Sequence, residues 1–307
     1  MFSCHWGYFP LSICTRIELS NYGYDIVSRE GPSLSEYLVC ADDTVMLDPN
    51  SLLKAGELDA TTARLVQAVK AHPADLSSRI FLFELYCFGG EYEKANAQLQ
   101  WIREECPDVD FGVQVYQNLL SAEQHRSRVF SYGGGPNFFD PPPPYLEMLL
   151  AVIKYVGETR YERARQLLEV SAMSWPVVKG TLNEISFSDI RDCLTFVAPV
   201  LEVIVGSRYY WVPWDTIQRV NLPSPKFLRD LYWLPGELSL RSGIHLSVFV
   251  PVLYPHTFSA SEESVKLGRK TVWEELGGGI VVGKGQRLFE YDETECPFLE
   301  VRSLVFS

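Results

Sequence analysis

The sequence places few residues at the spacings that catalysis or ligand binding requires. Gly278 to Lys284 reads GGIVVGK and fits the G-x-x-x-x-G-K spacing of a phosphate-binding loop. However, Gly285 stands where such a loop carries Ser or Thr to hold Mg²⁺, and Ile280 to Val282 would line the cradle with β-branched side chains. No helical pattern follows Lys284, so this stretch predicts a β-hairpin rather than a nucleotide site.

The histidines and cysteines indicate neither a metal site nor a nucleophile. The five histidines have no i, i+4 pairing and no carboxylate at ligand spacing; they are His5, His72, His125, His245 and His256. The seven cysteines are an odd number without a C-x-x-C pair, which argues against a zinc site or a disulfide framework and favours a reducing compartment. No G-x-S-x-G or Cys/His signature occurs, and carboxylates such as Asp189, Asp192 and Asp215 are interpreted as surface charges. We therefore predict no enzymatic activity, no metal and no cofactor.

Length and composition bound the class of protein. A chain of 307 residues, 47% of them hydrophobic, has enough apolar side chains for two ordinary domains. Its net charge of −12 disfavours a nucleic-acid partner, because a phosphate backbone requires a basic surface. No window approaches the ~18 apolar residues of a membrane span, and the N-terminus lacks the features of a signal peptide. The sequence predicts a cytoplasmic protein with no membrane insertion.

The elements that would position a binding site centre on an aromatic stretch, which reads RYYWVPW at 208–214 and LRDLYWLP at 228–235. Alternation puts aromatic side chains on both faces of 208–214, so both faces need cover. We expect 208–214 and 228–234 to be core strands that join the two halves of the chain, with partners for Arg229 and Asp230. The alternative is a partner-binding surface, whose candidate residues here are Arg208, Tyr210, Trp214, Arg229 and Asp230.

A 34-residue repeat runs through the N-terminal half. Gly56-Glu57-Leu58 recurs as Gly90-Glu91-Tyr92, and the proline of Ala71-His72-Pro73 recurs in Cys106-Pro107. A looser third copy, Gly157-Glu158-Thr159, precedes a helix start that is displaced by two residues. This period is typical of tetratricopeptide helix pairs, so we predict an antiparallel stack of helices. The predicted helices span 49–55, 59–71, 76–88, 92–105, 111–130, 144–156 and 160–173.

The hydrophobic period changes after Trp175-Pro176 from helical to alternating, which predicts a domain boundary. Short strands separated by turn residues are expected to form a small antiparallel β-barrel-like domain. The predicted strands span 182–187, 200–205, 207–213, 216–221, 228–234, 244–254, 271–276, 280–283, 286–291 and 297–305. The predicted fold is thus α+β multidomain: a poorly ordered extension over 1–45, a tetratricopeptide-like helical domain over 46–175 and a β-rich domain over 176–307. Met46 is an alternative start to Met1.

Seven sequence blocks in order carry a resemblance to a known family. They are LLKAGELD (52–59), ELYCFGGEYEKA (84–95), RYYWVPW (208–214), LRDLYWLP (228–235), GRKTVW (268–273), GQRLF (285–289) and CPFLEVR (296–302). With these blocks the chain resembles the ImpE (TagJ) family of type VI secretion accessory proteins, from about Leu47 to the end. Two features depart from the family pattern: Ser207 intervenes between Gly206 and Arg208, and residues 1–45 have no counterpart.

The resemblance implies a non-enzymatic adaptor that binds the small subunit of the contractile sheath through its N-terminal helix, with an indirect link to a ClpV-type AAA+ ATPase. A curved stack of helix pairs offers a groove for an amphipathic helix. We expect Glu84, Cys87 and Phe88 on the exposed side of helix 76–88, facing that partner. One alternative is a nucleic-acid or nucleotide-binding module that stacks bases on Tyr210 and Trp214, which the acidity opposes. Another is an enzyme whose site forms only in space.

Overall fold

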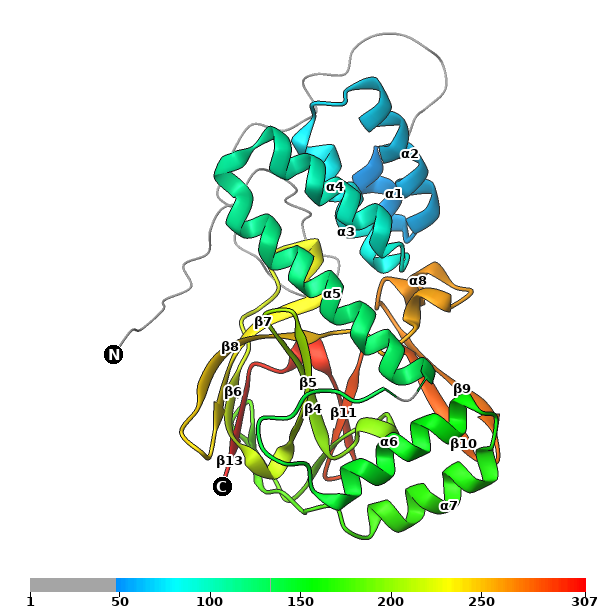
Figure 1. Cartoon of the computed structure of the whole chain (residues 1–307), viewed down its shortest axis with the longest axis vertical. Helices are drawn as coiled ribbons and strands as arrows, with labels where there is room; N and C mark the ends of the chain where they lie inside the picture. The colour runs from blue at the N-terminus through cyan, green and yellow to red at the C-terminus, as the bar shows by residue number, and fades with distance from the viewer. Residues whose placement is uncertain (1–47, 133) are drawn as a thin grey trace.

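The computed structural model describes residues 48–132 and 134–307. The predicted disorder of 1–45 and the choice between Met1 and Met46 lie outside these residues. Helices α1 to α4 occupy one end of the molecule and the strands the other, and the long helix α5 runs from one to the other (Figure 1). The last long helix ends at Ala172 and the first strand begins at Gly180, so the change of secondary structure falls where the sequence predicts it.

The predicted helices are confirmed, with ends that agree within two residues, and each packs against the next along the chain. They are α1 (Pro49–Ala55), α2 (Leu58–Ala71), α3 (Leu76–Phe88), α4 (Tyr92–Glu105), α5 (Asp110–Tyr132), α6 (Pro144–Gly157) and α7 (Tyr161–Ala172), followed much later by the short α8 (Glu263–Lys266). In Figure 1 the pair α6–α7 lies beside the strands, whereas α1 to α4 stand at the far end of α5. None of the helices in the described ranges is long and apolar enough to cross a membrane.

The sequence repeat is a repeated helix-capping turn. Gly56 and Gly90 adopt left-handed backbone with φ of +91° and +70°, and Thr159 takes the equivalent place with φ of +56°. In each hairpin the next backbone N–H donates to the carbonyl five residues earlier, which satisfies an orphan acceptor at the helix end. The third copy is displaced because Thr159, not Gly157, occupies the left-handed position.

Replacing Gly90 by alanine is expected to destabilise the protein by about 1–3 kcal/mol. The left-handed φ disfavours a side chain, and the new Cβ would lie 2.5 Å from the ring of Phe258, which packs on this turn from the strand-rich half. Gly206→Ala is the matched control, because Gly206 has a φ of +59° and nothing within 4 Å of its Cβ position. Urea unfolding of both variants separates the cost of the left-handed φ from the cost of the clash with Phe258. Equal losses of unfolding free energy in the two variants would show that the contact with Phe258 contributes nothing.

The strands form three antiparallel sheets. The first has eight strands in the order β2-β1-β13-β6-β7-β8-β4-β5, the second is β12-β11-β3 and the third is β10-β9. The strands are β1 (Gly180–Leu182), β2 (Ile185–Phe187), β3 (Ile190–Asp192), β4 (Val200–Val205), β5 (Arg208–Pro213), β6 (Ile217–Asn221), β7 (Trp233–Leu240), β8 (His245–Pro251), β9 (Thr271–Gly277), β10 (Ile280–Gly285), β11 (Leu288–Tyr291), β12 (Thr294–Pro297) and β13 (Ser303–Phe306). In the described residues the edge strands β2 and β5 of the first sheet are not paired with each other, so this sheet is not closed into a barrel. The phosphate-loop-like GGIVVGK belongs to the β9–β10 hairpin, as predicted.

The predicted strand 228–234 is wrong in its first half. Leu228–Leu231 is a 3₁₀ turn, and β7 begins only at Trp233. The Asp230 carboxylate accepts hydrogen bonds from the backbone N–H groups of Lys226 and Phe227, at 2.8 and 3.0 Å. This side-chain-to-backbone capping competes with an extended conformation, which alternation alone does not reveal.

The Pro-rich loop between α5 and α6 covers the outer edge of β5. The backbone N–H of Asn137 donates to the Tyr209 carbonyl, and the Trp211 N–H donates back to the Asn137 carbonyl. The ring of Phe139 stacks on that of Tyr210, with centroids 4.5 Å apart. The loop therefore protects a sheet edge that would otherwise be open to pairing.

Candidate functional site

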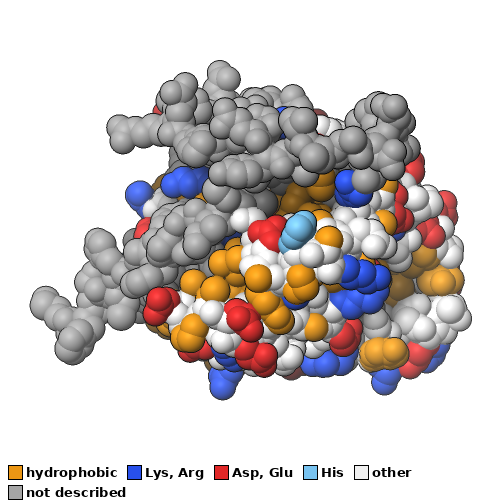
Figure 2. Space-filling view, turned by 90° about the horizontal axis from the view of Figure 1, so that it is seen from above, with side chains coloured by type: hydrophobic (Ala, Val, Ile, Leu, Met, Phe, Trp, Pro, Cys, Tyr) orange, Lys and Arg blue, Asp and Glu red, His pale blue; other side chains and the backbone are white. Residues whose placement is uncertain are grey.

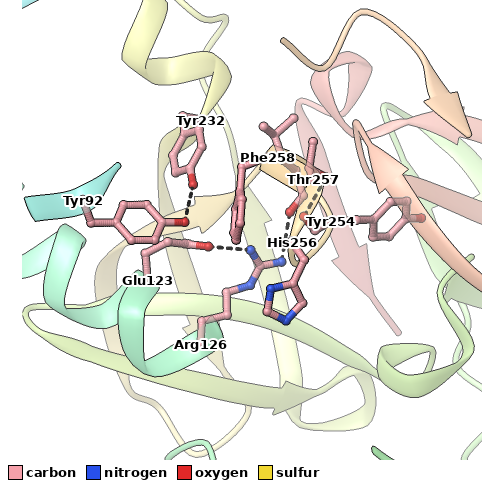
Figure 3. Close-up of a pocket in the computed structure, with 9 residues that line it drawn as sticks. Tyr92, Glu123, Arg126, Tyr232, Tyr254, His256, Thr257 and Phe258 are labelled. Atoms are coloured by element: carbon pink, nitrogen blue, oxygen red, sulfur yellow. Dashed lines mark hydrogen bonds and ion pairs between the residues drawn. The ribbon is translucent and has the colours of Figure 1, made fainter. Parts of the chain in front are cut away.

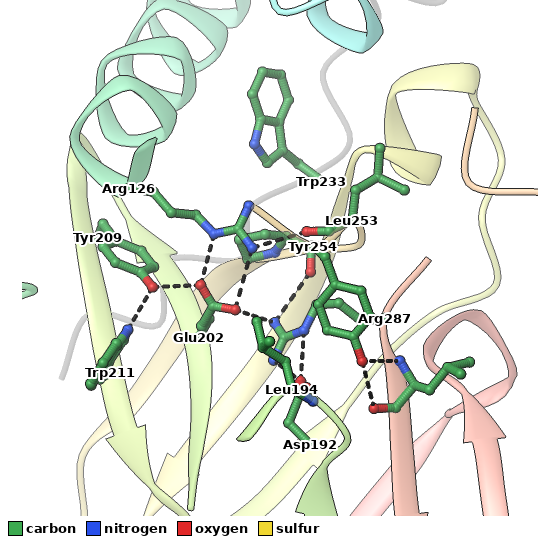
Figure 4. Close-up of polar contacts among 12 residues, drawn as sticks. Arg126, Asp192, Leu194, Glu202, Tyr209, Trp211, Trp233, Leu253, Tyr254 and Arg287 are labelled. Atoms are coloured by element: carbon green, nitrogen blue, oxygen red, sulfur yellow. Dashed lines mark hydrogen bonds and ion pairs between the residues drawn. The ribbon is translucent and has the colours of Figure 1, made fainter. Parts of the chain in front are cut away.

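Four charged side chains that are at most 2% exposed form a connected group of ion pairs at the junction between helices and strands. We call Arg126, Asp192, Glu202 and Arg287 the buried ionic cluster (Figure 4). Arg126 of α5 donates through Nε to Glu202 of β4 at 2.7 Å, and Arg287, between β10 and β11, donates to Asp192 of β3 at 2.6 Å. Glu202 also lies 3.4 Å from Arg287. The cluster therefore connects α5, through Arg126, to the first sheet at Glu202 and, through Arg287, to β3 of the second sheet.

Glu202 stays ionised at the centre of this cluster. Burial by itself would raise the pKa of Glu202, but the guanidinium groups of Arg126 and Arg287 outweigh it and hold the pKa below its usual value. Burial also raises the pKa of Asp192 to about 6, opposed by Arg287. The Tyr209 hydroxyl donates a hydrogen bond to Glu202, which holds the Tyr209 side chain of β5 against the cluster. The cluster is satisfied by protein groups and presents no free acid or base to a substrate.

Sequence reasoning missed this cluster. Asp192, interpreted as a surface charge, is 2% exposed, so that expectation is wrong. A local signal existed for Glu202, since it interrupts the otherwise apolar run VLEVIV at 200–205, where a charge needs a buried partner. No such signal singles out Arg126, because its partner Glu202 lies 76 residues away in the sequence.

The three residues expected to face a partner from α3 are buried instead. Glu84, Cys87 and Phe88 are only 1–2% exposed, so their predicted exposure is wrong. The physical reason is the composition of α3: its continuously buried part, 80–88, reads IFLFELYCF, and a helix that is apolar all round is covered on all sides. Burial also raises the pKa of the Cys87 thiol, which makes it a poor nucleophile.

The cover on α3 comes from the segment Phe227–Trp233, which we call the inserted segment. Arg229 donates to Glu84 of α3 at 2.7 Å and to the Tyr116 hydroxyl of α5 at 2.7 Å. The inserted segment also contacts three helices through Tyr232 and Trp233. The Tyr232 ring packs edge-on against Phe88 of α3, and the Tyr232 hydroxyl lies 3.0 Å from the Tyr92 hydroxyl of α4. The Trp233 indole N–H donates to Glu123 of α5 at 3.2 Å. The chain therefore fills this inner face of its own helices.

The other candidate residues divide between core and surface. Trp214 is fully buried, and Arg229 and Asp230 are 7% and 6% exposed. Arg208 is exposed and Tyr210 is half-buried beside Phe139. The aromatic stretch thus joins the two halves, as predicted, and only Arg208 and Tyr210 of the eight candidates keep accessible surface.

Glu84→Gln is expected to change how stability depends on pH. Burial raises the pKa of Glu84 from 4.5 to about 7, and one of its carboxylate oxygens has no hydrogen-bond partner. Because the folded-state pKa is the higher one, the stability that protonated Glu84 contributes is full below pH 4.5 and is lost as pH rises to about 7. The Gln variant should therefore gain stability relative to the wild type across this range in urea unfolding. Glu93→Gln, an exposed change on α4, is the control, and parallel pH curves for Glu84→Gln and the wild type would contradict the assignment.

A small pocket lies beside the cluster, between α5 and the strand-rich half (Figure 3). Its lining is Tyr92, Glu123, Arg126, Tyr232, Leu253, Tyr254, His256, Thr257 and Phe258. About 10 Å³ is open to the centre of a water molecule, which suits a single buried water rather than an organic substrate. Burial, with Arg126 and Lys284 nearby, lowers the pKa of His256. The described residues contain no group of three His, Cys, Asp or Glu that could hold a metal ion.

The charge pattern of the helical end is mixed. Figure 2, a view onto this end, shows basic, acidic and apolar side chains interspersed where the surface is not grey. On this part of the described chain no continuous basic surface is visible, whereas binding along a phosphate backbone requires one.

Comparison with known proteins connects this architecture to a family. Residues 184–305 match the family model described as ImpE protein. The type VI secretion system accessory component TagJ of Pseudomonas aeruginosa is 34% identical over 263 residues, which span 86% of this chain and 92% of that protein. The chain belongs to the ImpE/TagJ family. Two of the sequence blocks that carry the resemblance lie at the buried junction: 208–214 contains β5, and 228–235 contains most of the inserted segment and the start of β7.

A solved structure shares the fold of this ImpE/TagJ chain. The crystal structure of protein VPA1032 from Vibrio parahaemolyticus superposes with a TM-score of 0.79 and 23% identity. The match covers 84% of this chain and 97% of VPA1032. At this identity the likeness establishes the architecture of helices followed by sheets, and it carries no statement about partners.

Proposed function

We propose that the chain is a non-catalytic, cytoplasmic adaptor of type VI secretion that binds the small subunit of the contractile sheath through that subunit's N-terminal helix. The observation that carries this proposal is the 34% identity to an accessory component of type VI secretion over nearly its whole length. In this role the chain assists sheath assembly, or sheath recycling by the ClpV-type ATPase.

The helical half supports a helix-binding role. Its hairpins α1–α2, α3–α4 and α6–α7 repeat one capping turn, and we propose that they are tetratricopeptide-like units. Such units bind helices on apolar faces. Because the inserted segment fills the inner face of α3, the sheath helix binds a different side of the hairpins.

The alternative of a base-stacking module finds no support at its two candidate residues. Trp214 is fully buried, and the Tyr210 ring is already stacked on Phe139. Base stacking needs an accessible ring face, which Trp214 lacks and which Phe139 already occupies on one side of Tyr210.

The proposal is tested by calorimetric titration of the full chain with the sheath small subunit from the same gene cluster. We expect binding by the intact subunit and by its N-terminal helix as a peptide, and none by a subunit that lacks this helix. A scrambled peptide of the same composition is the control. Equal heats from the intact and the truncated subunit would overturn helix recognition, and no binding by either would overturn the proposed partner.

A further inference from the structure

The strand β9 has an open edge. Its one strand partner among the described residues is β10, and none of its seven residues is buried. In Figure 1 the β9–β10 ribbon lies at the rim of the molecule, beside α7. An unpaired strand edge presents a row of backbone N–H and C=O groups that another strand can join.

The other sheet edges are shorter or covered. The edge of β5 is paired with Asn137 and ends at Pro213, which has no N–H to donate. The edge strand β2 has only three residues, and the backbone N–H groups of Ser188 and Asp189 just after it bond to Asp292. Within the described ranges, β9 is therefore the longest strand edge left without cover.

The side chains of β9 select the chemistry of an added strand. Trp273 is 41% exposed and shares a face with Glu275 and with Val281 of β10, which is 37% exposed. On the opposite face Glu274 is 2.9 Å from Lys284, with half of its own side chain still in solvent. An added strand would thus meet Trp273, Val281 and Glu275 on one face and Glu274 on the other.

A second copy of the chain is a poor occupant for this edge. Antiparallel pairing of two β9 strands about Glu274, their middle residue, would bring the two Glu274 side chains directly opposite each other. Like charges directly opposite one another destabilise a strand pair. The same carboxylates attract a cationic segment, which gives the edge a preference for a different molecule.

We propose that β9 is a docking edge for an extended segment of a partner protein, with an apolar residue beside Trp273 and basic residues beside Glu274 and Glu275. Backbone hydrogen bonds along β9 supply the pairing, and the side chains set the register and the preference for basic sequences. This site is separate from the helix recognition proposed above and does not depend on it.

The test uses the full chain and a fluorescent peptide of about ten residues with a central Lys-Lys-Val, the order that antiparallel pairing places opposite Glu275, Glu274 and Trp273, flanked by alternating Thr and Val. Anisotropy measures affinity, and hydrogen exchange locates the site. We expect slower exchange of β9 amides in the complex and about tenfold weaker binding by Glu275→Lys. Glu290→Lys is the matched control: it changes an exposed glutamate on β11, which is paired on both sides, and should alter affinity less than about twofold.

A second peptide, N-methylated at alternate backbone amides, keeps the side chains but cannot complete the ladder, and it should not bind. The proposal is overturned if neither peptide binds, if the methylated peptide binds equally well, or if the protected amides lie outside β9. Sedimentation without peptide tests the remaining occupant: a concentration-dependent dimer with protected β9 amides would assign the edge to a second copy.

Discussion

Replacing Glu202 by alanine is expected to lower the free energy of unfolding by about 3–5 kcal/mol, because removing one partner leaves buried charges uncompensated. Glu202 is fully buried and is the carboxylate that Arg126 and Arg287 share. Without it each of the two guanidinium groups keeps one carboxylate partner, Glu123 for Arg126 and Asp192 for Arg287, and the Tyr209 hydroxyl loses its acceptor. Urea unfolding followed by circular dichroism measures the loss.

The control for this change is Glu158→Ala. Glu158 pairs with Arg160 in an ion pair whose side chains are 41% and 48% exposed. An exposed pair contributes little, so this variant should lose less than about 1 kcal/mol. Similar losses in the two variants would show that burial of the cluster does not matter.

Trp233→Ala is expected to cost about 3–5 kcal/mol, as the truncation of a large buried aromatic side chain does. Trp233 is 1% exposed, packs edge-on against Tyr232 and donates to Glu123 of α5. The variant therefore loses packing and a hydrogen bond between the two halves of the molecule. Trp273→Ala, at a 41% exposed tryptophan, provides the comparison and should cost much less. If Trp233→Ala is as stable as the wild type, the inserted segment is not packed against the helices, and the alternative that it is a partner-binding surface is favoured.

Local patterns explain why the helices were predictable. The glycines that recur after 34 residues coincide with the capping turns at Gly56 and Gly90, and the recurring prolines follow the ends of α2 and α4. The change to alternating hydrophobicity likewise located most of the strands, but the predicted strand 182–187 runs across a turn, 297–305 runs across the 3₁₀ turn Phe298–Glu300, and β3 was not predicted. Alternation predicted a strand at Leu228–Leu231, but the hydrogen bonds from the backbone N–H groups of Lys226 and Phe227 to Asp230 stabilise a turn there instead.

Long-range pairing explains what the sequence concealed. Helix periodicity assigned Glu84 to a solvent face, but its partner Arg229 is 145 residues away. A buried charge is tolerated only with such a partner, so an isolated helix pattern cannot reveal the burial of Glu84. The apolar composition all round α3 was the available signal, and it indicated cover on every side.

The central claim is that the inner face of the helical hairpins is an internal interface and not the groove in which a partner helix binds. Hydrogen exchange of the full chain, alone and saturated with the sheath small subunit, tests it most directly. We expect the amides of α3 to exchange as slowly as those of β4 in both states, with new protection confined to other helices. Fast exchange of α3 in the free chain, followed by protection when the small subunit binds, would show that the inserted segment leaves this face and that the partner takes its place.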